Sequence, residues 1–243
     1  MSFLSRLCPA ALSGLLWLTV NPVIAQTPVF LELVLAVDCS SSVSDSEFEL
    51  QMQGLARAFE HPDVLGALEN VGETGIAVAL LQWSGAEEQV RAIDWHRITR
   101  AADAEAFAGL IDATPRYVDG GATAIGTAMR DAVEWLSAND YVGQRKVIDV
   151  SGDGRANQGE SPAFVRAAAT AQGITINGVA ILNEEPRLAR YYAAGVVGGD
   201  GAFLLTADDY EDFARAIRKK LFFEIIGPPI VQAPPAGPQN ARR

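Results

Sequence analysis

Residues 30–42 read FLELVLAVDCSSS, and this stretch decides the fold. From Phe30 to Val37 the chain is almost continuously apolar over the length of one strand, and Asp38 then opens a run of small polar residues. A strand that is apolar on both faces is typical of the centre of a parallel sheet, where helices cover both sides. The sequence therefore predicts a central strand that ends in a polar loop.

Strand-like and helix-like segments alternate along the rest of the chain. Further strands are predicted at residues 75–83, 89–98, 146–150, 174–182 and 202–206. Amphipathic helices are predicted around residues 48–59, 101–113, 127–136, 162–172, 186–194 and 208–226. Such alternation indicates crossover connections and parallel strands. The predicted fold class is α/β: a doubly wound, mostly parallel central sheet of about six strands, with helices on both faces and one antiparallel edge strand.

Composition limits the classes of protein that this chain can represent. It has 243 residues, 49% of them hydrophobic and 20% charged, which suits one domain with a substantial core. The net charge of −11 argues against binding to nucleic acid or to anionic membrane surfaces, because both need a basic face. Cys8 and Cys39 are too few for a disulfide scaffold. The two histidines, His61 and His96, do not have the spacing of a zinc site.

The N-terminal stretch has the order of a secretory signal. Arg6 precedes an apolar run over residues 7–20, and Val23 and Ala25 suit the −3 and −1 positions of a signal-peptidase site. We expect cleavage after Ala25, an exported protein that is periplasmic or secreted, and no stable membrane insertion after cleavage. An uncleaved anchor is the alternative, although Pro9 leaves a short span for it. The predicted divisions are 1–25 signal peptide, 26–226 folded domain and 227–243 Pro-rich flexible tail.

Three polar loops carry side chains that could act together. The first holds Asp38, Ser40 and Ser42, the second holds Thr123 after two glycines, and the third holds Asp153 between two glycines. Ligand sites in open α/β sheets form beyond the carboxyl ends of strands, so we expect these side chains to converge. Two carboxylates and three hydroxyls are hard oxygen ligands that suit Mg²⁺, Mn²⁺ or Ca²⁺. The sequence predicts a metal site there and no catalytic residues.

This pattern resembles the metal-ion-dependent adhesion site of von Willebrand factor A domains, over roughly residues 30–226. The resemblance implies a doubly wound domain with the metal at the top of the sheet. It also implies that Ser40, Ser42 and Thr123 are hydroxyl ligands and that Asp38 and Asp153 bind directly or through water. More narrowly, the segments VIDVSGDG, YYAAGVVGGDGAF and FARAIRKKL resemble an exported bacterial family of unknown function.

One position departs from the common pattern of the metal-ion-dependent adhesion site. A Thr commonly precedes the third-loop Asp, whereas here Gly152 precedes Asp153 and Ser151 lies one place further back. Ser151 is therefore a candidate for the residue that helps to hold Asp153 in place.

Other polar residues near the motif have simpler explanations. Asp149, inside a strand, either supports the site or makes a structural hydrogen bond. Cys39 is expected to be a buried, inert thiol, and Tyr191 and Tyr192 are expected in the core. The basic run 218–220 is interpreted as interacting favourably with the C-terminal end of the dipole of the last helix.

The predicted function is a non-enzymatic module that grips a protein partner through a divalent cation, with Mg²⁺ the best fit and Mn²⁺ or Ca²⁺ as alternatives. The partner, of unknown identity, would supply a carboxylate. One alternative is a Mg²⁺-dependent phosphoryl-transfer hydrolase, for which Arg155 could be the required cation, although Ser40 stands where such enzymes need a second Asp. Another is a structural envelope component whose metal site is vestigial. No P-loop or GxSxG elbow occurs in the sequence.

Overall fold

The computed structural model describes residues 26–227. The predicted signal peptide and residues 228–243 of the predicted tail lie outside the described residues. Within the described range, no helix combines the length and the apolar character needed to cross a membrane.

A single sheet organises the described residues, and its strand order is β3-β2-β1-β4-β5-β6. All neighbouring strands run parallel except β3, which pairs antiparallel with β2 at one edge. The predicted fold class is confirmed. The strands are β1 (Thr27–Asp38), β2 (Ile76–Trp83), β3 (Gln89–Ile98), β4 (Tyr141–Gly152), β5 (Ile174–Ile181) and β6 (Leu204–Ala207).

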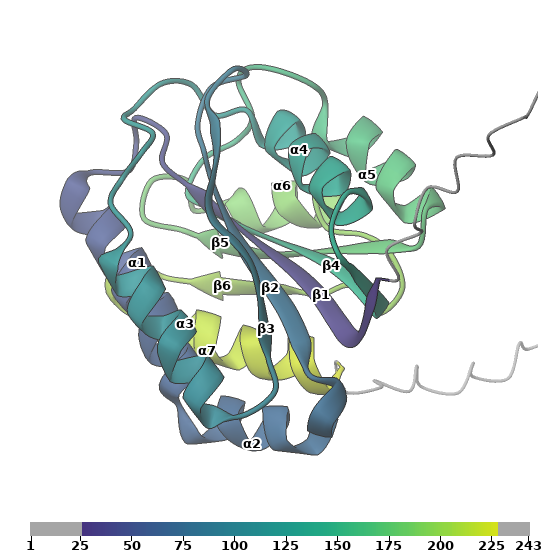
Figure 1. Ribbon diagram of the computed structural model, residues 1–243. Helices are drawn as coiled ribbons and strands as arrows, with labels where there is room; N and C mark the ends of the chain where they lie inside the picture. Colours follow the sequence, from purple (N-terminus) through teal and green to yellow (C-terminus); the bar gives the residue numbers. More distant parts are fainter. Residues whose placement is uncertain (1–25, 228–243) are drawn as a thin grey trace, which may run out of the picture.

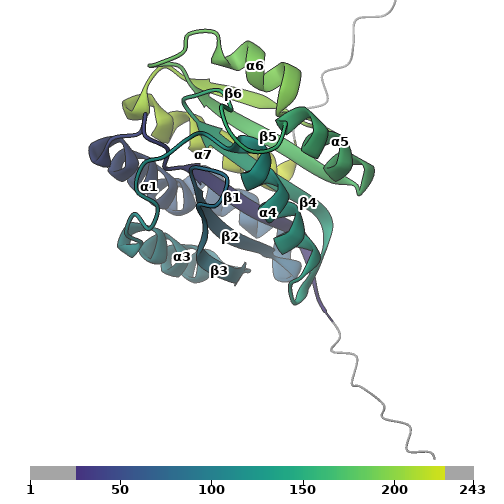
Figure 2. The same cartoon turned by 90° about the horizontal axis from the view of Figure 1, so that it is seen from above.

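Helices cover both faces of this sheet (Figures 1 and 2). One face carries α1 (Asp45–Glu60), α2 (Pro62–Val71), α3 (Ala101–Ala113) and α7 (Tyr210–Ile226). The other face carries α4 (Ile125–Ser137), α5 (Pro162–Ala171) and α6 (Leu188–Gly195). A separate cluster of buried apolar side chains fills each of the two interfaces between helices and sheet.

Strand β1 shows why the apolar run is continuous. Leu33 and Leu35 belong to the core under α1 and α7, whereas Val34 and Ala36 belong to the core under α4 and α6. Successive side chains of a strand point to opposite faces, so both faces of β1 need apolar residues. The same alternation directs Asp38 toward the α6 side of the sheet.

Two features of the fold were not predicted. Helix α2 and a following 3₁₀ turn (Gly72–Thr74) lie in a segment for which no element was expected. Pro62 occupies the first turn of α2, and the His61 ring accepts a hydrogen bond from the backbone of Asp63 at 3.2 Å, so the start signal was present. Strand pairing also begins earlier than the apolar runs suggest, because Thr27 already pairs with Tyr141.

Candidate metal centre

The predicted site lies where two neighbouring parallel strands end. β1 and β4 pair as far as Val37 and Ser151, so Asp38 and Asp153 leave the sheet side by side. After β1 the chain turns to α1 on one face, and after β4 it turns to α5 on the other. This divergence opens a crevice at the switch point, which is where open α/β sheets bind ligands. A capping box between Ser44 and Glu47 starts α1 directly after the first loop.

Four of the five predicted residues form one hydrogen-bonded cluster. The Ser42 hydroxyl donates to Asp153 Oδ1 at 2.6 Å, and the Ser40 and Ser42 Oγ atoms lie 3.3 Å apart. The Ser40 backbone N–H donates to Asp38 Oδ1 at 2.8 Å. Asp38, Ser40 and Asp153 are fully buried, whereas Ser42 is exposed. The cluster is therefore accessible to solvent on the Ser42 side.

Thr123, the fifth predicted residue, lies in the second loop, which contacts both the Asp38 loop and the Asp153 loop. Its backbone N–H donates to Asn157 Oδ1 at 2.9 Å, and the Asn157 N–H donates back to the Thr123 carbonyl at 3.0 Å. A Cβ atom added to Gly154 would lie 3.7 Å from Thr123 Oγ1, so the hydroxyl adjoins the Asp153 loop. The Ser41 N–H donates to the Gly121 carbonyl at 3.1 Å. Each of the three predicted loops thus contacts another.

The electrostatics of the cluster favour an added positive charge. Burial, and then the neighbouring Asp153 carboxylate, raise the pKa of Asp38 to about 7. Asp38 Oδ2 has no hydrogen-bond partner among the described residues, and Asp153 Oδ2 accepts only from the Tyr210 hydroxyl, at 3.0 Å. Within residues 26–227, no Lys, Arg or His nitrogen lies within 4.0 Å of either carboxylate. Two adjacent buried carboxylates without a cation suit a hard divalent ion.

A metal site at this place would depend on the three hydroxyls. The described part of the chain holds no group of three or more His, Cys, Asp or Glu side chains that could bind a metal. A site with two carboxylates therefore needs Ser40, Ser42 and Thr123 to reach a useful number of oxygens. This composition excludes the nitrogen and sulfur sites that zinc prefers and agrees with Mg²⁺, Mn²⁺ or Ca²⁺.

Arg116 is a site residue that the sequence reasoning missed. Its guanidinium donates to the backbone carbonyls of Cys39 and Val43, each at 2.9 Å, and to Asp45 Oδ1 at 2.9 Å. Only 12% of the side chain is exposed. No local sequence pattern indicates that an arginine in a loop will be buried. Arg116 fixes the shape of the first loop from the connection between α3 and α4.

Polar side chains at the end of β2 hold the Thr123 loop in a similar way. The Gln82 amide donates to the Pro115 carbonyl at 2.9 Å and accepts from the Tyr117 N–H at 2.7 Å. The Ser84 hydroxyl donates to the Ala122 carbonyl at 3.1 Å. These buried bonds leave the loop little freedom, which favours a preformed site.

Asp149 does not belong to the cluster. Its carboxylate pairs with Lys220 of α7 at 2.7 Å, and Lys220 also pairs with Glu224 at 2.7 Å. The Asn177 amide donates to both Glu224 oxygens at 2.9 Å. Of the two explanations left open for Asp149, the structure favours the structural one. The interpretation of residues 218–220 as interacting with the C-terminal dipole of the last helix is wrong for Lys220, which is fully buried, pairs with Asp149 and lies before the last turn of α7.

Ser151 and Cys39 have no direct place in the cluster. The Ser151 hydroxyl donates to the Ala36 carbonyl of β1 at 3.4 Å, so it braces the sheet and does not hold the Asp153 side chain. Burial, and then the Asp38 carboxylate, raise the pKa of the Cys39 thiol to about 12. The thiol stays protonated at neutral pH, in agreement with the expected inert cysteine.

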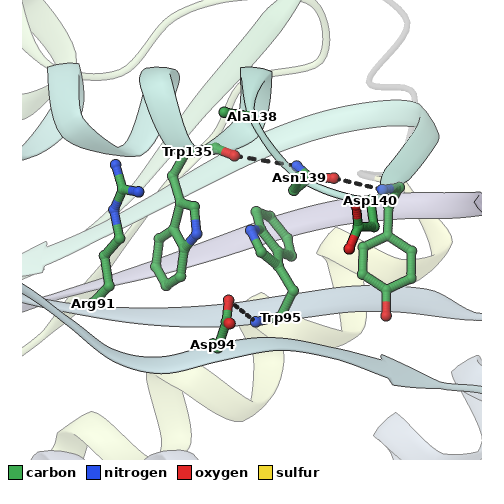
Figure 3. A pocket seen from close by; sticks show the side chains of 8 residues that line it. Arg91, Asp94, Trp95, Trp135, Ala138, Asn139 and Asp140 are labelled. Carbon is green, nitrogen blue, oxygen red and sulfur yellow. Dashed lines mark hydrogen bonds between the residues drawn. The ribbon is translucent and has the colours of Figure 1, made fainter. Parts of the chain in front are cut away.

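A hollow of about 490 Å³ lies elsewhere, near Tyr141 at the amino end of β4. Figure 3 shows Trp95 and Trp135 at its centre, and their rings pack edge to face with centroids 5.5 Å apart. The Arg91 guanidinium lies 5.1 Å from the Trp135 ring, and the Asp94 carboxylate accepts from the Trp95 backbone at 2.7 Å. The Trp95 ring nitrogen is buried without a hydrogen-bond partner among the described residues. The hollow nevertheless lacks a pair of adjacent buried carboxylates, so the oxygen cluster (Asp38, Ser40, Ser42, Thr123 and Asp153) is the better candidate site.

Solved structures with the same fold come from several sources. The chain is 17% identical to the mussel byssus proximal thread matrix protein 1 with a zinc-occupied MIDAS motif (TM-score 0.59, covering 83% of this chain and 49% of that one). It is 13% identical to the pilus adhesin SpaC of Lactobacillus rhamnosus GG (TM-score 0.60, 81% and 30%). It is 14% identical to the vWF domain of the type V pili tip protein Mfa5 of Porphyromonas gingivalis (TM-score 0.54, 81% and 96%). The fold is that of a von Willebrand factor A domain.

Sequence comparison gives the family but no activity. This chain spans about half the length of the mussel protein, so that protein as a whole is not a guide to its activity. No curated protein matches the sequence. A family model matches residues 28–229, nearly the whole described range. The chain belongs to the family described as "Protein of unknown function (DUF1194)".

Proposed function

We propose that this chain is an exported protein-binding module that acts through a divalent cation. Asp38, Ser40, Ser42, Thr123 and Asp153 would hold the ion, and a carboxylate of a protein partner would complete its coordination. The observation that carries the proposal is the pair of fully buried carboxylates, joined through Ser42, with no protein cation within 4.0 Å in the described chain.

The donor set explains why an acidic partner group is expected. Two carboxylates balance the charge of a divalent ion, while hydroxyls add coordination without further negative charge. When bound, the ion would supply positive charge beside the exposed Ser42, where an outside carboxylate can approach. Mg²⁺ fits this oxygen set best, and Mn²⁺ or Ca²⁺ are the alternatives.

The other parts of the proposal rest on sequence and on fold. The first 25 residues would be removed as a signal peptide, residues 26–226 would form the domain, and residues 227–243 would be a flexible tail. Pilus adhesins among the structural neighbours, and the zinc-occupied MIDAS motif of the mussel protein, support an adhesive and extracytoplasmic role without catalysis.

The geometry does not favour a phosphoryl-transfer enzyme. Arg155, the cation that such chemistry would need, pairs with Glu185 at 3.3 Å and lies over the Tyr191 ring at 5.3 Å. Lys146 pairs with Glu32 at 3.5 Å, well below the site in the sheet. Neither is directed at the oxygen cluster. Hydrolysis of generic phosphomonoesters above the level of an Asp38→Ala variant would reverse this conclusion.

Cation-dependent capture of acidic envelope proteins tests the proposal. Immobilised wild-type protein should retain them with Mg²⁺ or Mn²⁺, release them with a chelator, and lose them to excess glutamate-containing peptide. An Asp153→Ala variant should retain none, whereas Asp119→Ala, which removes an exposed carboxylate from the neighbouring loop, should behave as wild type. Retention that ignores the chelator would contradict the proposal and favour a structural role with a vestigial site.

A further inference from the structure

Gly152, which departs from the Thr-Asp pattern, sits where no side chain fits. A Cβ atom placed on it would lie 2.6 Å from Asp38 Oδ2 and 2.8 Å from the Tyr192 hydroxyl. Real Cβ atoms do not make such approaches to other heavy atoms. Glycine is therefore required by the close approach of these two oxygens, and Tyr192 occupies the space that a larger residue would take.

The two oxygens that face this point are both unsatisfied. Tyr192 of α6 is fully buried, and its hydroxyl has no hydrogen-bond partner among the described residues. Asp38 Oδ2, also buried, has none either. Buried polar atoms are rarely left without partners, and two such atoms beside one gap call for a common explanation.

The neighbouring tyrosine shows that this is not a general property of α6. The Tyr191 hydroxyl accepts a hydrogen bond from the Ala156 N–H at 3.3 Å and lies at a partly exposed position. Tyr192, one residue on, points into the sheet side of the helix and toward the oxygen cluster. Burial, and then the carboxylates of Asp38 and Asp153, raise the pKa of Tyr192 well above its usual value. A tyrosine hydroxyl beside a carboxylate oxygen acts as the hydrogen-bond donor.

We propose that Tyr192 is a positioning residue of the cation site: when an ion is bound, its hydroxyl donates to Asp38 Oδ2 across Gly152 and holds that carboxylate in its ion-binding orientation. In this role Tyr192 replaces the hydroxyl that commonly precedes the third-loop Asp. The inference rests on the proposed cation site but adds a residue from α6, outside the three predicted loops. Gly152 and Tyr192 act together, because the absence of a side chain at Gly152 leaves room for the Tyr192 hydroxyl.

Tyr192→Phe tests the role because phenylalanine keeps the ring and removes only the oxygen. The binding of Mn²⁺ to the full chain is measured by calorimetry, and the melting temperature is measured in a chelator. We expect about a tenfold or greater rise in Kd, since a hydrogen bond to a charged group is lost. The melting temperature of the cation-free variant should be unchanged, because phenylalanine keeps the ring packing and the Tyr192 hydroxyl has no hydrogen bond to lose among the described residues. Tyr191→Phe is the matched control, with Kd unchanged.

The possible results separate this inference from the proposed function. If wild type binds Mn²⁺ and Tyr192→Phe binds equally well, the positioning role is wrong and the cation site stands. If Kd weakens only together with a fall in the cation-free melting temperature, the tyrosine is merely structural and the inference fails. If wild type itself binds no Mn²⁺, the proposed function fails and the inference fails with it.

Discussion

Two buried carboxylates, Asp149 on β4 and Asp153 just past its end, have opposite surroundings. Asp149 faces α7, where Lys220 supplies a cation at 2.7 Å. Asp153, four residues on, meets the Ser42 hydroxyl and the carboxylate of Asp38, with no cation in the described chain. The first group, Asp149, Lys220, Glu224 and Asn177, is here called the ion network. The second is the oxygen cluster.

The difference shows how a protein separates structure from binding. In the ion network the compensating charge is built into α7 and is sealed, since Lys220 and Glu224 are both fully buried. In the oxygen cluster the acidic charge is buried, and under the proposed function an outside ion would supply the compensating charge beside Ser42. The pKa of Asp149 is raised to about 6 by burial, with Lys220 opposing the rise, while that of Asp38 is raised to about 7 by burial and by Asp153.

Removing the built-in cation should have the largest effect. Lys220→Met leaves the Asp149 and Glu224 carboxylates buried without a positive charge, and we expect a loss of about 3–5 kcal/mol in the free energy of unfolding. Urea denaturation measures it. Lys219→Met, at the exposed neighbouring position, should change stability by less than about 0.5 kcal/mol. Added Mg²⁺ should not rescue Lys220→Met, and a loss below about 1 kcal/mol would show that the network is not a structural unit.

Releasing the first loop should have a smaller effect that extends to the oxygen cluster. Arg116→Met removes the guanidinium bonds to the Cys39 and Val43 carbonyls, and we expect a loss of about 2 kcal/mol in stability. Because those carbonyls flank Ser40 and Ser42, cation affinity should fall as well. Arg100→Met, which removes an exposed surface pair with Asp103, is the control for both readouts. Unchanged cation affinity in Arg116→Met would contradict this prediction and show that the shape of the first loop does not control ion binding.

Neutralising Asp38 should change the stability of the cation-free protein in a pH-dependent way. The folded pKa of Asp38 lies above its ordinary value of 3.8, so the cation-free protein loses stability as pH rises from about 4 through about 7. Asp38→Asn removes that loss and should gain about 2 kcal/mol at pH 8 but little at pH 4. Urea denaturation in a chelator at both pH values measures the difference, and a loss of stability at pH 8, or an equal gain at both pH values, would contradict it.

The sequence was informative where local pattern and chemistry coincide. The apolar run of β1 predicted a central strand because both of its faces need burial, and the carboxyl ends of parallel strands lie together whatever the loops contain. Asp38, Ser40, Ser42 and Asp153 could therefore be assigned to one place before their contacts were known.

Residues that depend on tertiary packing could not be assigned. Lys220 follows two other basic residues on α7, and only the packing of α7 against β4 shows that it faces Asp149. Arg116 reads as a surface residue until the first loop folds over its guanidinium. Tyr192 was expected in the core, which is correct for its ring, but nothing in the sequence directs its hydroxyl toward Asp38. Long-range contacts between distant segments decide all three positions.

Titration of the full chain with Mg²⁺ and with Mn²⁺ in a calorimeter, alongside an Asp38→Ala variant, tests the central claim most directly. The account predicts one ion per chain, a melting temperature that rises with ion concentration as RT ln(1 + [L]/Kd) requires, and neither effect in Asp38→Ala, which still folds. Wild-type protein that binds neither ion at millimolar concentration, or an Asp38→Ala variant that binds as wild type does, would contradict it.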